Sequence, residues 1–169
     1  MRSLSLVVSI ALAAVVSVAC AACASGSYVP ADRPTGDDAG ETNGRRFDFV
    51  SNKPAEDEWQ IRVTGSSMWV SYARDAKSDK LGSIRLTEAE TNKLWDLIDA
   101  VNIPGRKQGT KDEDVGYVSL QLKEPAVGGE PSARYMRYMS RATENKQLIA
   151  LATYLQDLTE KYKKERPSF

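Results

Sequence analysis

The 169-residue chain contains no histidine and only two cysteines, Cys20 and Cys23, which lie close together near the N-terminus. Without histidine, the chain cannot build Ser-His-Asp or Cys-His catalytic groups or the usual Cys/His zinc sites. With no cysteine after Cys23, the rest of the chain cannot form an internal disulfide. We therefore expect a domain stabilised by packing, with no enzymatic activity, no cofactor and no metal.

The chain also has no excess of charge of either sign, with 23 Lys and Arg and 23 Asp and Glu. The first 24 residues contain one arginine and no acidic residue, so the remainder carries 22 basic and 23 acidic side chains. Nucleic-acid-binding proteins concentrate positive charge. We therefore expect no nucleic-acid partner.

The one long apolar stretch, residues 4–19, has no charged residue and leads directly to Cys20. It is shorter than the roughly 20 apolar residues that a membrane helix needs, and it is typical of a secretory signal. A cysteine after small residues resembles the start of an exported bacterial lipoprotein, in which that cysteine is acylated. This predicts a signal in residues 1–24, with Cys20 or Cys23 as the lipidated residue.

Two other fates of this N-terminal stretch stay open. Cleavage at Ala22-Cys23-Ala24 would remove both cysteines and give a secreted protein, and an uncleaved stretch would act as an anchor. In the lipoprotein alternative, acyl chains hold the protein at a membrane. Because no aspartate follows either cysteine, the resemblance implies the outer membrane, with the domain facing the periplasm or the cell surface.

Residues 25–45 are rich in Gly, Asp, Pro, Ser, Thr and Ala and contain one aromatic residue, Tyr28. Such a composition buries little apolar surface and predicts a flexible tether, although a structured alternative stays open. A tether of this length spans roughly 25 Å on average. Residues 46–166 then form a single domain.

Within this domain, alternation of apolar and polar residues predicts strands, and a 3-4 spacing predicts helices. A capping box, Thr87 with Glu90, opens the first helix, and Ile103-Pro104-Gly105 ends it. The second helix opens at Thr143, and residues 75–80 form a polar turn. The expected strands are residues 47–50, 59–63, 68–72, 81–86, 117–123 and 133–140.

Short connections between most of these strands imply antiparallel pairing, and runs 59–63 and 68–72 are expected to form a hairpin. Each helix carries one apolar stripe, Leu94 to Val101 in the first and Leu148 to Tyr162 in the second. The predicted fold class is therefore α+β, with an antiparallel sheet of about five to six strands and two helices packed on one face.

Four residues are candidates for binding a partner: Trp69, Tyr135, Arg137 and Arg141. Trp69 alternates with core residues, so it is either an exposed contact residue or packed beside a cross-strand neighbour such as Arg62. Arg and Tyr are enriched at interfaces, and paired arginines bind carboxylates. The alternative for the last three residues is a strand that completes the core, with arginine stems covering its edge.

The layout also resembles a known family. The strands at 59–63 and 68–72, the run Leu86-Thr87-Glu88-Ala89-Glu90, residues 94–104 ending in Ile103-Pro104, the strand at 117–123 and the helix at 148–158 are similar to emfourin-type small proteins. Characterised members inhibit thermolysin-like metalloproteases. The resemblance covers roughly residues 59–158 and implies a protease inhibitor, with no inhibitory residues assigned.

Two classes of function follow from these observations. The first is a membrane-anchored, non-catalytic binding module, of which a protease inhibitor is one form. The second is a structural or assembly lipoprotein that scaffolds an envelope complex through its sheet edge or its terminal helix. Both classes imply a membrane contact through the N-terminal lipid and a protein partner in the cell envelope.

The acylation site is tested by comparing Cys20→Ala, Cys23→Ala and the double variant for partitioning into detergent. We expect one single variant to lose partitioning, because one cysteine carries the lipid. Partitioning by both single variants but not by the double variant would show that the two sites are redundant. A double variant that stays membrane-bound would show that lipid is not the anchor.

Overall fold

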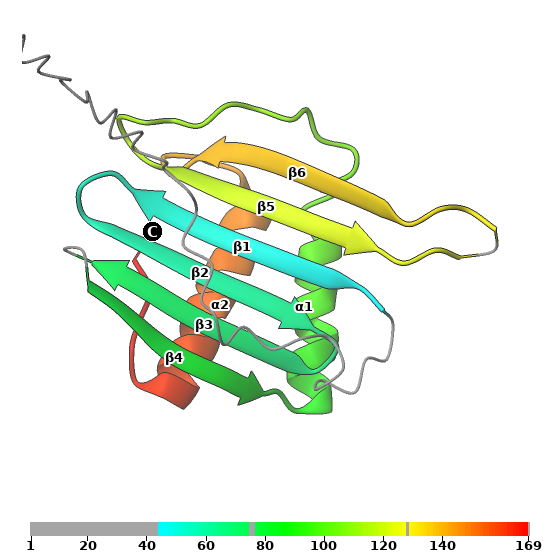
Figure 1. Ribbon diagram of the computed structural model, residues 1–169, viewed down its shortest axis with the longest axis horizontal. Helices are drawn as coiled ribbons and strands as arrows, with labels where there is room; N and C mark the ends of the chain where they lie inside the picture. Colours follow the sequence, from blue (N-terminus) through cyan, green and yellow to red (C-terminus); the bar gives the residue numbers. More distant parts are fainter. Residues whose placement is uncertain (1–43, 75–76, 128, 169) are drawn as a thin grey trace, which may run out of the picture.

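A computed structural model of the protein describes residues 44–74, 77–127 and 129–168, shown in Figure 1. These residues form six strands and two helices. Their bounds are β1 Arg46–Lys53, β2 Asp57–Thr64, β3 Ser67–Arg74, β4 Lys77–Arg85, α1 Glu88–Ala100, β5 Tyr117–Glu124, β6 Ala133–Ser140 and α2 Lys146–Lys163. In the described part of the chain, neither helix has the length and apolar character needed to cross a membrane.

The strands form one antiparallel sheet in the order β4-β3-β2-β1-β5-β6. Strands β1 to β4 follow one another as a meander, and β5 and β6 form a hairpin on the other side of β1 (Figure 1). The connection that contains α1 carries the chain from the β4 edge to β5. The predicted α+β class, the six antiparallel strands and the hairpin between β2 and β3 are confirmed.

The core combines alternate strand residues with the apolar stripes of both helices. Phe47 and Phe49 of β1 are almost fully buried, and the helices lie behind the sheet in Figure 1. Burying one such side chain contributes about 2 kcal/mol. The cluster also contains Trp59, Ile61, Val63, Met68, Val70, Ile84, Leu86, Leu94, Trp95, Ile98, Val101, Ile103, Val118, Leu120, Leu122, Leu148, Leu151, Ala152, Leu155 and Leu158.

Three predicted boundaries are wrong. Helix α1 ends at Ala100, before the predicted stop, because Asn102 has a positive φ of 54° that turns the chain out of the helix. Helix α2 begins after Asn145, whose side chain accepts from the Leu148 N–H, and not at Thr143. Residues 77–80 of the predicted polar turn belong instead to β4 and pair with residues 71–74 of β3, and residues 75–76 lie outside the described residues.

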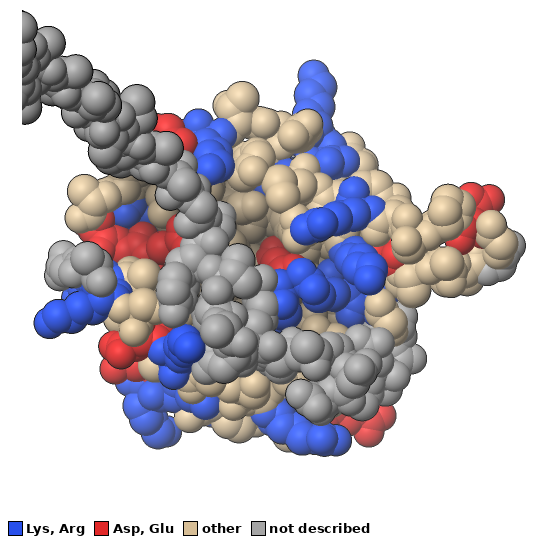
Figure 2. Space-filling view, in the orientation of Figure 1, with Lys and Arg blue, Asp and Glu red and all other residues tan. Residues whose placement is uncertain are grey.

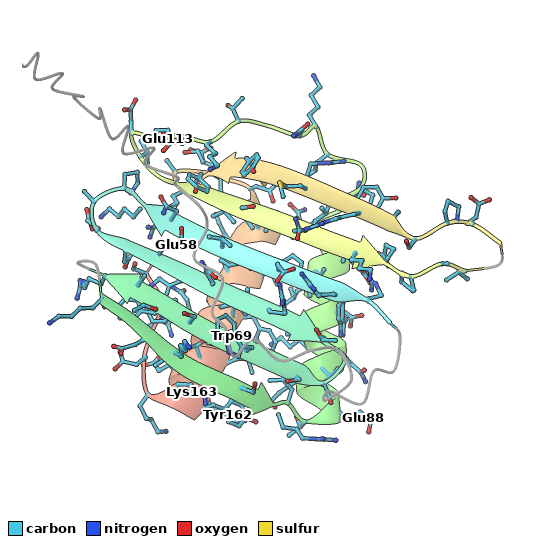
Figure 3. The ribbon with its side chains drawn as sticks, in the orientation of Figure 1. Glu58, Trp69, Glu88, Glu113, Tyr162 and Lys163 are labelled. Atoms are coloured by element: carbon cyan, nitrogen blue, oxygen red, sulfur yellow. The ribbon has the colours of Figure 1, made fainter. Side chains whose placement is uncertain are left out.

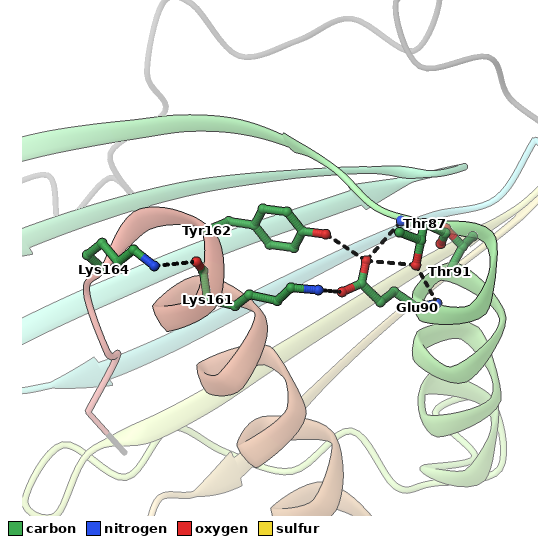
Figure 4. A network of polar contacts seen from close by, with 6 residues as sticks. All are labelled: Thr87, Glu90, Thr91, Lys161, Tyr162 and Lys164. Atoms are coloured by element: carbon green, nitrogen blue, oxygen red, sulfur yellow. Dashed lines mark hydrogen bonds and ion pairs between the residues drawn. The ribbon is translucent and has the colours of Figure 1, made fainter.

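Glu90 connects the start of α1 to the end of α2 (Figure 4). Its carboxylate accepts from the Thr87 N–H at 2.9 Å, which completes the predicted capping box. It also accepts from Lys161 Nζ at 2.6 Å and Tyr162 Oη at 2.9 Å. Tyr162, predicted on the apolar stripe, therefore makes a polar contact at the surface.

These contacts change the acidity of Glu90. Partial burial disfavours its ionised form, but the hydrogen bonds from Lys161, the Thr87 backbone and Tyr162 outweigh that cost. They lower the pKa of Glu90 from 4.5 to about 2. Because the folded-state pKa lies below the ordinary value, the stabilisation is present above pH 4.5 and is lost as pH falls toward 2.

We therefore expect Glu90→Gln to lower the free energy of unfolding at pH 7 by about 1 kcal/mol, the difference between charged and neutral hydrogen bonds. Urea denaturation at pH 7, 4.5 and 3 measures the effect. The difference from the wild type should shrink as pH falls. Glu88→Gln, at an exposed first-turn position, is the matched control; an equal loss in both variants would contradict the role of Glu90.

Candidate partner-binding face

Alternate strand residues point away from the core cluster, because successive side chains of a strand lie on opposite faces. We call this surface the polar face. The cross-strand registers assign to it Arg46, Asp48, Val50, Asn52, Glu58, Gln60, Arg62, Thr64, Ser67, Trp69, Ser71, Lys80, Ser83, Arg85, Tyr117, Ser119, Gln121, Lys123, Arg134, Met136 and Tyr138.

A ladder of polar contacts crosses the middle of this face. Asp48 of β1 accepts from Arg46 Nε at 3.0 Å and from Arg62 Nε of β2 at 2.5 Å, so one carboxylate lies between two guanidinium groups. The Arg62 and Asp48 side chains are only 7% and 11% exposed. On β6, Arg134 Nη2 donates to Gln121 Oε1 of β5 at 2.8 Å. The row Trp69, Arg62, Asp48, Gln121 and Met136 thus runs in register across five strands.

Positive charge predominates on the polar face, where the described strand residues include six basic residues but only two acidic ones, Asp48 and Glu58. Figure 2 shows Lys and Arg side chains grouped on this side of the molecule, toward the hairpin of β5 and β6. Burial lowers the pKa of Arg62, Asp48 opposes that shift, and the cations Arg46 and Arg134 add to it. The face therefore favours an anionic ligand.

The centre of the polar face is buried. Trp69, near the middle of β3 in Figure 3, is 1% exposed. Gln60, Thr64 and Ser71 around it are also buried. Among the described residues, Figure 1 shows no helix or strand in front of these positions. The alternative of an exposed Trp69 is therefore wrong, and Trp69 lies in register with Arg62, as the other alternative expected.

Tyr135 and Arg137 lie on the opposite side of β6 from the polar face. Tyr135 packs against the core cluster and lines a cavity of about 640 Å³ beside Arg45 and Glu124. Arg137 lies 5.8 Å from the Tyr135 ring and donates to the Met136 carbonyl at 2.8 Å and the Pro104 carbonyl at 3.0 Å. This arrangement matches the alternative in which β6 completes the core and an arginine covers its edge.

Arg141 follows β6 and is held inside the domain. Its Nη1 lies 3.4 Å from Asp57 Oδ1, and its side chain is 4% exposed. Its Nη2 donates to Ser168 Oγ at 3.5 Å, and Ser168 also donates to Asp57. These contacts attach the C-terminal residues to β2, so Arg141 is not presented to a partner.

The four residues predicted to bind a partner therefore do not form one site. Trp69 lies on the polar face, and Tyr135 and Arg137 lie on the other side of β6. Arg141 belongs to a buried ion pair. Cys20 and Cys23 lie outside the described residues. Within the ranges that the structure describes, no three His, Cys, Asp or Glu residues are grouped to hold a metal ion.

The free edge of the sheet at β6 is partly covered. The Tyr138 N–H donates to the Gln108 carbonyl at 2.7 Å, so the loop after α1 pairs with β6 as a strand would. Gly109 permits this approach, because its φ is +71° and a Cβ there would lie 2.2 Å from the Tyr138 carbonyl oxygen. With the Met136 carbonyl bound by Arg137, this half of the edge is closed to strand addition.

Sequence analysis missed the residues that make the polar face basic, above all Arg46, Arg62, Lys123 and Arg134. Each is a polar residue in an alternating strand, and such residues most often face solvent. A signal was available in Arg46, two residues before Asp48 on β1, and in Arg62, the cross-strand partner of Asp48 on β2. Recognising it requires the strand order, because β5 and β6 join this face only after a helix and two long loops.

No family model matches the chain, and no curated protein matches it. The resemblance to emfourin-type proteins therefore remains a prediction.

Because of this ladder, we expect Asp48→Asn to lower the free energy of unfolding strongly. The substitution removes the carboxylate that neutralises the buried Arg62. We expect a loss in the free energy of unfolding on the order of 3 kcal/mol, as for other broken buried pairs. In the double variant Asp48→Asn/Arg62→Met, removal of the buried charge should recover much of that loss. Urea denaturation of the three proteins measures it, and a double variant less stable than Asp48→Asn would contradict the ladder.

Proposed function

We propose that the protein is a membrane-anchored, non-catalytic binding module of the cell envelope that binds an acidic, extended segment of a partner protein on its polar face. The observation that carries this proposal is the basic face around buried Trp69. An anchor at Cys20 or Cys23, in the outer membrane, would hold the domain where envelope proteins reach it.

The proposal takes both helices to be packed on one face of the sheet, which leaves the polar face for a partner. Alternate strand residues and the stripes of α1 and α2 belong to one buried cluster, which supports this arrangement. Such a sheet presents side chains at regular spacings of about 5 Å between strands, which suits an extended ligand.

Charge and chemistry favour an acidic ligand. Lys123, Arg134 and Arg85 are exposed at the rim of the face, while Arg62 and Trp69 lie at its buried centre. Arginines bind carboxylates through paired hydrogen bonds. Complementary charge would also accelerate association.

A protease inhibitor is one form of this module, as the emfourin resemblance implies, and the inhibited enzyme would then supply the acidic segment. Scaffolding of an envelope complex is the alternative form. The covered half of the β6 edge disfavours a scaffold built by strand addition there, so the polar face is the surface we favour for either form.

The proposal is tested in native membranes with a photocrosslinking residue at Lys123 or, as a control on α2, at the exposed Ile149. We expect position 123, and not 149, to crosslink a stoichiometric partner, and the yield to fall at high salt because exposed charges are screened. Lys123→Glu/Arg134→Glu should abolish the product. Lys107→Glu/Lys146→Glu, a matched change away from the polar face, should leave it intact.

Inhibition of a panel of thermolysin-like proteases by micromolar purified protein distinguishes the two forms. Inhibition that Lys123→Glu/Arg134→Glu removes would identify an inhibitor. A crosslinked partner without inhibition would identify a scaffold. Equal crosslinking from both positions, or none from either, would overturn the assignment of the polar face.

A further inference from the structure

We propose that the protein binds a free fatty acid of medium chain length in a groove on the helix side of the sheet, where the chain passes from β6 into α2. We call this cavity the α2 groove. Its volume is about 240 Å³, and its walls include Val118 of β5, Arg141, and Leu148, Ile149 and Ala152 of α2. The groove lies on the other side of the sheet from the polar face, so this inference does not depend on partner binding there.

The first ground is the apolar character of the walls. Val118, Leu148 and Ala152 belong to the buried core cluster, so the core is open to a ligand at this point. Ile149 is 47% exposed and is one of five large apolar side chains that the described residues expose. An aliphatic chain in the groove would therefore remove apolar surface from water along much of its length.

The second ground is Arg141, the one charged residue of the walls. Its side chain is 4% exposed, and hydrogen bonds to a charged group strengthen when water is excluded. Yet Nη1 lies 3.4 Å from Asp57 and Nη2 lies 3.5 Å from Ser168, distances beyond the usual range of about 2.7–3.2 Å. A guanidinium can donate more hydrogen bonds than these two. Arg141 therefore has donors left for a carboxylate inside the groove.

The third ground is the charge around Arg141. A second cavity, of about 310 Å³, also borders Arg141, and its walls carry Lys53, Arg74, Glu56 and Asp57. The Glu56 carboxylate is neutralised by Lys53 at 2.5 Å. Together with Arg141 these residues are three cations and two carboxylates, a net charge of +1. An anionic head group at Arg141 would therefore enter a region with an excess of positive charge.

The size of the groove limits what can reach Arg141. A protein partner cannot, because the side chain is enclosed by Asp57, Ser168 and the walls. A ligand that fits inside the groove can. Pockets for drug-sized ligands begin at about 300 Å³, and the α2 groove is smaller than that, with about 240 Å³. The groove therefore suits a chain of medium length.

The backbone around the groove favours a fatty acid over the C-terminal residue of a peptide. Both ligands have an apolar group and a carboxylate, but a peptide also has main-chain groups that need hydrogen-bond partners. Val118 is paired with β1 on one side and β6 on the other. The N–H groups of Leu148 and Ile149 bond to Asn145. This strand and this helix turn therefore have no N–H to offer a peptide, whereas an alkyl chain needs none.

The site is tested on the full chain in native membranes, with an octanoate analogue that carries a photoactivatable diazirine in its chain. We expect mass spectrometry to find the label in residues 117–124 and 141–153, and unlabelled octanoate to compete with it. The free aqueous concentration for half-competition should fall about fourfold for each methylene added from hexanoate to octanoate. Octanol, which lacks the carboxylate, should need at least about tenfold more than octanoate.

Two pairs of variants complete the test. Thr153→Trp, at an exposed position in the wall, should fill the groove and remove the labelling, whereas Ala150→Trp, exposed on α2 outside the wall, should not. Asp57→Asn removes the carboxylate that shares Arg141, so octanoate should compete at lower concentration and octanol at the same one. In Asp57→Asn/Arg141→Met, where no buried charge is left unpaired, octanoate should lose its advantage over octanol.

Three results would overturn the inference. The first is labelling that octanoate does not compete away or that Thr153→Trp retains. The second is equal competition by octanol and octanoate in the wild type, which would show that Arg141 binds no head group. The third is stronger competition by N-acetyl-leucine than by octanoate, which would identify a site for a peptide C-terminus.

Discussion

The alternation of side chains along β1 is the constraint on which both sides of the molecule depend. Phe47 and Phe49 enter the core, and Asp48 between them faces the other way and binds Arg46 and Arg62. A slip of one residue would place the carboxylate in the core and a phenylalanine among arginines. Because β1 pairs with both β2 and β5, its register also determines which residues of those strands share each face.

The two faces differ in how they are stabilised. The helix side depends on apolar packing, completed where Glu90 joins the first turn of α1 to the last turn of α2. The polar face depends on one carboxylate that holds two guanidinium groups, with further basic residues around them. Cations gathered at one surface repel one another. The acidic segment of a partner that we propose would relieve that repulsion.

Local patterns predicted most of the fold. The capping box of Thr87 and Glu90, the hairpin of β2 and β3 and the stripes of both helices depend on neighbours in sequence. They are confirmed, except that Tyr162 of the second stripe lies at the surface. The start of α2 was misplaced because Thr143 and Asn145 can both cap a helix, and only Asn145 bonds to the Leu148 N–H. The polar face was harder to predict. Arg62 of β2 and Arg134 of β6 share one face only because of the strand order, which no local sequence pattern reveals. Arg141 was misjudged for the same reason, since its partner Asp57 lies 84 residues away.

The loop that pairs with β6 matters where many copies of the domain lie close together. Copies held at a membrane by the proposed anchor would diffuse in two dimensions, where neighbouring domains would meet often and in similar orientations. An open sheet edge under those conditions would favour growth of one continuous sheet through many copies. The hydrogen bond from the Tyr138 N–H to the Gln108 carbonyl, made possible by Gly109, covers part of the β6 edge against such growth. A cut beside Lys107 or Lys111 would free this loop and expose the Tyr138 N–H, so proteolysis there would open this part of the β6 edge to strand addition.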